Sequence, residues 1–208
     1  MNGNFNPIFV NSTLQILEKR CLTLLFEGYN AIKLNANITI DWEEEDISKA
    51  LILYWNTSKK RGLWNIGIIP EHRIYNDDKM PAKKAARIDF RFSSWTRNQE
   101  CTYFAEAKNL IETDTLKTGR KTKTSAISLQ KRYIKTGIGN YFSGRYPSNG
   151  CLLGYVLQGN TQNIIDSINR HLSNNGRQSE QLDFDCLEGY YVSKHNELFI
   201  KHLMFDFT

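Results

Sequence analysis

Two short alternating segments contain the residues whose types and spacing best suit catalysis. Asp89 lies in RIDFRF (residues 87–92), where charged and apolar residues alternate strictly. Glu106 and Lys108 lie in a second alternating segment, residues 101–108. Side chains two positions apart point to the same face of a strand. We expect the two segments to pair as an antiparallel hairpin, which brings a carboxylate from each strand and an amine together.

Two carboxylates and an amine suit metal-assisted hydrolysis of a phosphate ester. Mg²⁺ prefers oxygen ligands, and it usually takes one or two protein carboxylates and completes its shell with water and phosphate oxygens. Asp89 and Glu106 are therefore candidate Mg²⁺ ligands, with Mn²⁺ as a substitute ion. Lys108 is a candidate for orienting or deprotonating a metal-bound water, or for stabilising charge on the phosphate.

The sequence RIDF…YFAEAK resembles the core of the PD-(D/E)xK nuclease superfamily, which has the restriction-endonuclease-like fold. The matching residues are Asp89, Glu106 and Lys108, with Ile88 at the position of the name-giving proline. The resemblance covers roughly residues 41–172. It implies an αβββαβ core and a Mg²⁺-dependent endonuclease that hydrolyses DNA phosphodiester bonds with a metal-activated water.

Many members of that family carry a further acid on the helix that precedes the sheet. Glu44 stands three and seven residues before Ile47 and Leu51, on the apolar face of a predicted helix, so we expect it to point inward as a fourth catalytic residue. A first-turn acid favoured by the helix dipole explains the same residue equally well. The alternatives for this role are Glu43, Glu18 and Glu71.

A basic stretch directly follows the candidate metal site. No acidic residue occurs between Thr115 and Gly159, and this interval includes several tyrosines. Such a stretch suits contact with a phosphate backbone, which makes nucleic acid the favoured partner. The candidate nucleic-acid-binding residues are Lys117, Arg120, Lys121, Lys123, Lys131, Arg132 and Lys135.

The elements that must position these residues follow from hydrophobic periodicity and helix caps. Apolar spacing predicts helices over residues 11–29 and 41–56, the second capped by Asp41, and further helices over residues 125–135 and 161–172. Gly137, Gly139 and Gly144 predict turns. We expect strands over residues 63–70, 87–92, 101–108, 151–157, 189–193 and 198–207, and a polar connection over residues 71–86. Together they predict one α/β domain over residues 1–208 with a central mixed sheet flanked by helices.

Composition sets the outer limits of this interpretation. The chain has 208 residues, a formal net charge of +5 and 40% hydrophobic residues, which suits one globular domain. The longest apolar runs are too short to span a membrane, and no secretory signal pattern is present, so we expect a cytoplasmic protein. The four cysteines are far apart and predict reduced core residues.

Two other classes of function compete with the nuclease. One is a non-catalytic nucleic-acid-binding module that retains the same fold, and the other is an interaction subunit whose basic stretch binds an acidic protein. If the nuclease cuts both strands of DNA with one small site per chain, a homodimer is expected.

Overall fold

The computed structural model describes residues 7–75, 81, 83, 85–96 and 98–208, with side chains described from Ser12 onward. The helices are α1 (Pro7–Asn35), α2 (Glu44–Thr57), α3 (Lys59–Leu63), α4 (Ala126–Arg132), the π-helix η2 (Tyr133–Ile138), α5 (Gly139–Phe142), α6 (Thr161–Asn174) and the 3₁₀ turn η3 (Gln178–Glu180). The strands are β1 (Gly67–Ile74), β2 (Ala86–Thr96), β3 (Gln99–Ile111), β4 (Gly150–Gln158), β5 (Asp183–Asp185), β6 (Tyr190–His195) and β7 (Leu198–Asp206).

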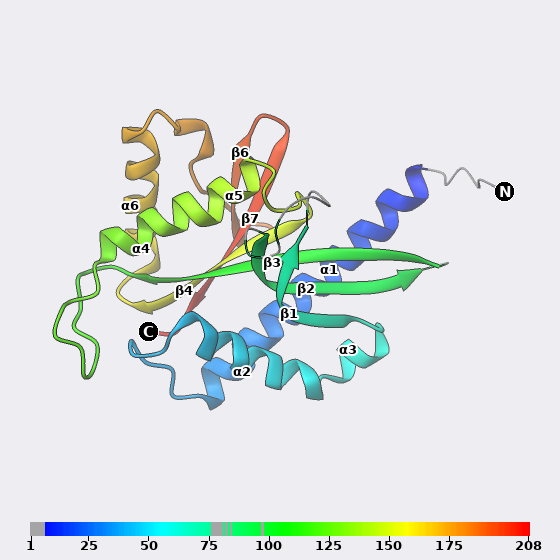
Figure 1. Cartoon of the computed structure of the whole chain (residues 1–208), viewed down its shortest axis with the longest axis horizontal. Helices are drawn as coiled ribbons and strands as arrows, with labels where there is room; N and C mark the ends of the chain where they lie inside the picture. Colours follow the sequence, from blue (N-terminus) through cyan, green and yellow to red (C-terminus); the bar gives the residue numbers. More distant parts are fainter. Residues whose placement is uncertain (1–6, 76–80, 82, 84, 97) are drawn as a thin grey trace.

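The strands form one mixed sheet of seven, in the order β1-β2-β3-β4-β7-β6-β5 (Figure 1). Strands β1, β2 and β3 form an antiparallel meander, and β4 runs parallel to both β3 and β7. The remaining pairs, β7 with β6 and β6 with β5, are antiparallel. The predicted α/β fold with a mixed sheet and an antiparallel β2–β3 hairpin is confirmed.

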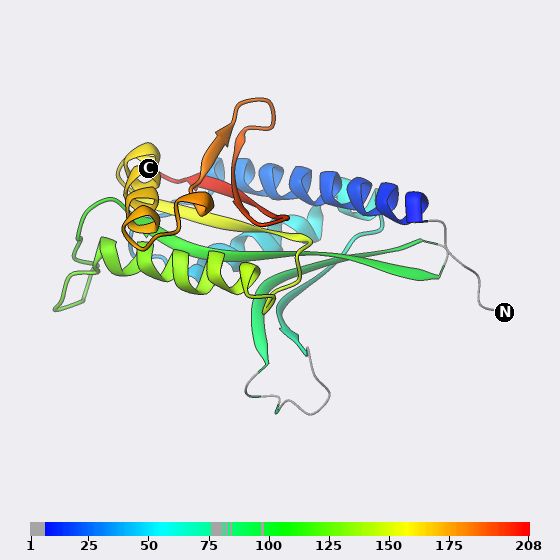
Figure 2. The ribbon, with the colours of Figure 1, turned by 90° about the horizontal axis from the view of Figure 1, so that it is seen from above.

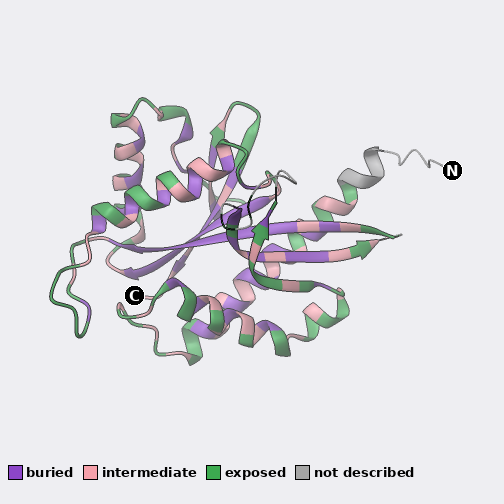
Figure 3. Ribbon diagram, in the orientation of Figure 1, coloured by how far each residue is buried: buried purple, intermediate pink, exposed green. Residues whose placement is uncertain are grey.

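Helices cover both faces of the sheet, and each face has its own hydrophobic core (Figures 2 and 3). Helices α1 and α2 pack against one face around Leu51 and Trp55. Helix α6 and the π-helix pack against the other face around Ile168 and Tyr133. Strand β4 contributes neighbouring residues to opposite cores, which explains why its sequence is almost continuously apolar.

Several predicted boundaries are wrong for identifiable local reasons. Helix α2 begins one turn later than expected, because Glu43 is its N-cap in a capping box with Asp46. Asp41 instead accepts a hydrogen bond from Thr118 N at 2.6 Å. A further short helix, α3, capped by Ser58, follows α2, so the first strand starts at Gly67 instead of residue 63 and continues to Ile74. The predicted connection that follows lies partly outside the described residues.

Of the three glycines predicted to form turns, Gly144 does so and Gly137 and Gly139 do not. Residues 126–142 form a helical run from α4 through the π-helix into α5, so Gly137 and Gly139 are helical. A Cβ atom at Gly137 would lie 2.7 Å from Leu152 Cδ2, so the glycine permits close packing of the helix on β4. Gly144, with a φ of +72°, does lie after the helix ends.

Two further predictions concern the cysteines and the membrane. Cys21, Cys101 and Cys151 are buried free thiols, whereas Cys186 is exposed, so the prediction of core positions is wrong for Cys186. In the described part of the chain, no helix combines the length and apolar character needed to cross a membrane.

A buried histidine gives the fold a testable pH dependence. His202 lies between the Tyr133 hydroxyl, 2.9 Å from Nδ1, and the Ser193 hydroxyl, 2.8 Å from Nε2. Burial lowers the pKa of His202 to about 3. Between that value and the ordinary pKa of about 6.5, the unfolded chain binds a proton that the folded chain does not, so stability falls as the pH falls.

We therefore predict that His202→Gln reduces the loss of stability on acidification, by up to about 1.4 kcal/mol for each pH unit below 6. Urea unfolding at pH 7, 6, 5 and 4.5 measures this slope. His171→Gln, at a partly exposed histidine, is the control and should retain the wild-type slope. Parallel slopes for wild type and His202→Gln would contradict the prediction.

Candidate functional site

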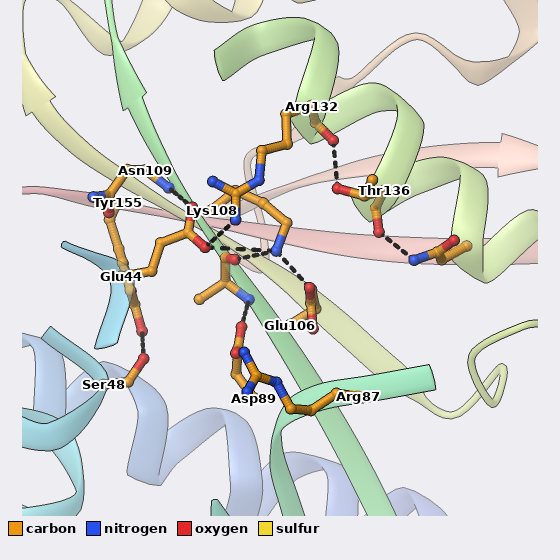
Figure 4. Close-up of polar contacts among 12 residues, drawn as sticks. Glu44, Ser48, Arg87, Asp89, Glu106, Lys108, Asn109, Arg132, Thr136 and Tyr155 are labelled. Carbon is orange, nitrogen blue, oxygen red and sulfur yellow. Dashed lines mark hydrogen bonds and ion pairs between the residues drawn. The ribbon is translucent and has the colours of Figure 1, made fainter. Parts of the chain in front are cut away.

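The centre of the candidate site is the ammonium group of Lys108, which is buried on β3 (Figure 4). Its Nζ atom lies 2.5 Å from Glu106 Oε1 and 3.7 Å from Glu44 Oε2. It also donates a hydrogen bond to the carbonyl oxygen of Ala107 at 2.7 Å. A buried ammonium requires such partners, because its transfer from water without them is very costly. The structure thus brings Glu44, Glu106 and Lys108 together.

Asp89 joins this group because β2 separates from β3 at that residue. The pairing of the two strands runs from Thr96 opposite Gln99 as far as Phe90 opposite Ala105. At the next position the Asp89 side chain replaces a backbone partner, and its Oδ2 atom accepts a hydrogen bond from Ala107 N at 2.7 Å. The Asp89 carboxylate is therefore fixed beside the strand that carries Glu106 and Lys108 (Figure 4).

Burial raises the pKa values of both strand carboxylates, and the charge of Asp89 adds to the shift of Glu106. The pKa of Glu106 is raised to about 7, first by burial and then by the nearby charge of Asp89, while Lys108 opposes the shift. Burial also raises the pKa of Asp89, against the opposing effects of Lys108 and the Ala107 hydrogen bond. Such crowding of acids is relieved by a cation, and it is common at functional sites.

Glu44 points inward as predicted, but both of its oxygens already have protein partners. Oε1 accepts a hydrogen bond from Asn109 N at 3.0 Å. Oε2 accepts one from the Arg132 guanidinium at 2.8 Å. Glu44 therefore connects α2 with β3 and α4. This places it as a positioning residue for Lys108 and Arg132, while its place in catalysis stays a prediction.

The other acids considered for this role lie elsewhere. Glu43 is the exposed cap of α2 and forms ion pairs with Lys117 and Arg120. Glu18 pairs with Lys201, and Glu71 lies 3.6 Å from Arg87. The structure thus places Glu44, and none of these three, against Lys108.

The predicted nucleic-acid-binding residues fall into two groups. Lys117 is buried, and its Nζ atom lies 3.2 Å from Glu43 and 3.3 Å from the carbonyl oxygen of Trp42, while its contact with nucleic acid stays a prediction. Arg120 and Arg132 are exposed but paired with Glu43 and Glu44. The exposed cations without such a pairing in the described structure are Lys121, Lys123, Lys131 and Lys135.

Asn109 is a site residue that sequence reasoning missed. Its backbone N–H and its side-chain amide bind Glu44 and the Trp42 carbonyl, but its buried Oδ1 atom has no hydrogen-bond partner. The available signal was its position, a polar residue directly after Lys108 in a strand that is otherwise apolar beyond it.

Asp89 and Glu106 are the two strand carboxylates that could hold a divalent cation. Glu106 Oε2 is buried without a hydrogen-bond partner, so it is an acceptor that a cation would satisfy. Among the residues that the structure describes, no group of three or more His, Cys, Asp or Glu side chains could hold a metal ion. Mg²⁺ needs only one or two protein carboxylates, so Asp89 and Glu106 are a sufficient protein contribution.

Two pockets adjoin the site, one on each side of the first turn of α2. Asp89 lines the first, together with Glu45 of α2 and Glu71 of β1. Glu44 lines the second, next to the loop between β3 and α4.

Comparisons of the chain with protein-family models, curated proteins and solved structures found no match.

The contacts of Glu44 predict a stability effect. Glu44→Gln should destabilise the fold by about 1–3 kcal/mol, because it removes the charge that compensates Lys108 and Arg132. The control is Glu45→Gln, which changes the same charge at the next, exposed position of α2. Equal unfolding midpoints in urea for the two variants would show that Glu44 is an ordinary first-turn acid.

The repulsion between the strand carboxylates predicts a pKa change in the metal-free protein. Asp89→Asn should lower the pKa of Glu106 from about 7 toward its ordinary value, because it removes a neighbouring negative charge. Carbon-13 NMR of the glutamate carboxyls during a pH titration measures this pKa. An unchanged Glu106 titration would mean that the two side chains do not interact.

Proposed function

We propose that this protein is a Mg²⁺-dependent endonuclease of the PD-(D/E)xK type that hydrolyses DNA phosphodiester bonds. The observation that carries the proposal is the convergence of Asp89 and Glu106 beside the buried ammonium of Lys108. Two carboxylates from adjacent strands and one lysine are the set that the sequence resemblance implies. Glu106 Oε2, buried and without a partner, adds an open ligand position to that set.

The order of elements around the site supports the same proposal. Helix α2 and the short α3 are followed by the antiparallel strands β1, β2 and β3, then by the helical run from α4 to α5 and by strand β4. This order is compatible with an αβββαβ unit. Within it, β3 carries Glu106 and Lys108, and the connection through α4 returns the chain parallel to β3 in β4. Asp89 lies on the neighbouring strand β2, at the residue where β2 diverges from β3.

The proposed roles follow from the contacts of each residue. Asp89 and Glu106 would hold Mg²⁺, which supplies a Lewis acid and an activated water when bound. Lys108 would orient the attacking water and stabilise charge on the phosphate, since its ammonium is held between two carboxylates. Glu44 would keep Lys108 in position. Lys121, Lys123, Lys131 and Lys135 would contact the DNA backbone through their charges.

A non-catalytic nucleic-acid-binding module remains the alternative function, and a cytoplasmic location and a homodimer remain predictions. One observation supports this alternative: the site is deeply buried, with Glu106 5% exposed and Lys108 4% exposed. A site that stays this closed would bind DNA without cutting it.

The nuclease proposal predicts that Asp89→Asn, Glu106→Gln and Lys108→Met each reduce cleavage at least 100-fold, as expected for groups that act on the transition state. These variants keep side-chain size and limit the effect on folding, which urea unfolding checks. The assay is conversion of supercoiled plasmid to nicked or linear DNA in Mg²⁺, Mn²⁺ or Ca²⁺.

Glu197→Gln, at an exposed acid between β6 and β7 that lines neither pocket, is the control and should cleave like the wild type. Ca²⁺ should support binding with little cleavage, since its looser coordination positions water poorly. Binding without cleavage in both Mg²⁺ and Mn²⁺ would support the non-catalytic module, and cleavage that survives in all three site variants would refute the proposed site.

A further inference from the structure

The pocket beside Glu44 is a separate feature with its own chemistry. Residues from the start of α2, the end of β3, the β3–α4 loop and helix α4 line it. Four cations line it, and they come from two parts of the fold: Lys117, Arg120 and Lys123 from the loop and Arg132 from α4. The acids in its wall are Glu43 and Glu44.

The charges of the pocket do not balance. Glu43 is shared by Lys117 at 3.2 Å and Arg120 at 3.6 Å, and Glu44 pairs with Arg132 at 2.8 Å and lies 3.7 Å from Lys108. Lys123 has no partner among the described residues. Each acid thus serves more than one cation, and the lining retains an excess of positive charge. This excess favours an anionic ligand.

A second, independent feature calls for a hydrogen-bond donor in the ligand. Asn109 lines the same pocket, is 5% exposed, and has a buried Oδ1 atom without a partner. An unpaired buried acceptor is costly unless a ligand or water satisfies it. The hydroxyl groups of Thr122 and Thr124 also line the pocket and can donate to a phosphate oxygen.

We propose that this pocket binds a single nucleotide unit, with its phosphate group on Arg120 and Lys123 and a base or sugar donor on Asn109 Oδ1. The proposal deepens the nuclease function and rests on it for the expectation that the nucleotide belongs to a DNA strand. A nucleotide combines the anion and the donor that the two observations require. The same phosphate chemistry is present in a free nucleotide and in a strand, so the test must separate these sources.

The pocket makes a different prediction from a continuous basic track. Lys121 and Lys135 are exposed cations of the same stretch that do not line the pocket. The double variant Arg120→Gln/Lys123→Gln removes two charges inside the pocket. Its matched control, Lys121→Gln/Lys135→Gln, removes two charges outside it, so the net charge of the protein is the same in both.

The test is binding to the full-length protein in EDTA, measured by calorimetry, with dAMP and with a ten-nucleotide DNA strand that lacks a terminal phosphate. The pocket variant should weaken binding of both probes about tenfold or more, as loss of charge-assisted hydrogen bonds implies. The control should change dAMP binding less than about twofold, and it should weaken strand binding less than the pocket variant does, because it removes only backbone contacts outside the pocket. Glu43→Gln should tighten binding severalfold, because it releases Lys117 and Arg120 from their shared acid.

Each outcome decides the proposal. Selective loss with both probes or with the strand alone supports a strand nucleotide, and selective loss with dAMP alone assigns the pocket to a free nucleotide. Equal losses in the two double variants, or no binding of either probe, overturn the proposal. Plasmid cleavage is measured separately. If the pocket binds dAMP but the protein does not cleave DNA, only the nuclease proposal is refuted. If the protein cleaves DNA but the two double variants lose binding equally, only the pocket proposal is refuted.

Discussion

The buried ammonium of Lys108 is the constraint on which the candidate site depends. A buried charge of this kind persists only when partners from the surrounding fold compensate it, and here Glu106 comes from the same strand and Glu44 from a helix earlier in the chain. Glu44 can reach it only because the first turn of α2 lies against the end of β3, where Asn109 N and Arg132 hold its two oxygens. The packing of α2, β3 and α4 and the burial of a charged Lys108 therefore depend on each other.

The divergence of β2 from β3 supplies the other half of the site. A regular ladder would give Ala107 N a backbone acceptor, but at this point the acceptor is the Asp89 side chain. The use of this side chain as the acceptor brings a second carboxylate close to Glu106, and the resulting repulsion contributes to the raised pKa of Glu106. The hydrogen bond that satisfies the backbone thus also brings two acids close enough to repel each other.

The sequence predicted the strands of the site better than the helices around them. Alternation of apolar and charged residues identifies a half-buried strand directly, so the positions of Asp89, Glu106 and Lys108 followed from the pattern. Gly137 was misread because turn propensity is local, whereas the need for a glycine there comes from Leu152 on β4. The cap of α2 was misplaced for a similar reason, since Asp41 is engaged by Thr118 from a distant loop.

Charge counting along the sequence has the same weakness, and it alters how the basic stretch is understood. The interval between Thr115 and Gly159 has no acid of its own, yet Glu43 and Glu44 enter it from α2 and occupy Lys117, Arg120 and Arg132. These ion pairs neutralise part of the positive charge that a count along the sequence makes available for binding DNA. The same ion pairs hold the cations at fixed positions. A cation that shares its acid with another cation is only partly neutralised, so it can still bind a second anion. The acids of α2 thus organise the cations beside Lys108 into a defined site, which a mobile basic loop alone would not provide.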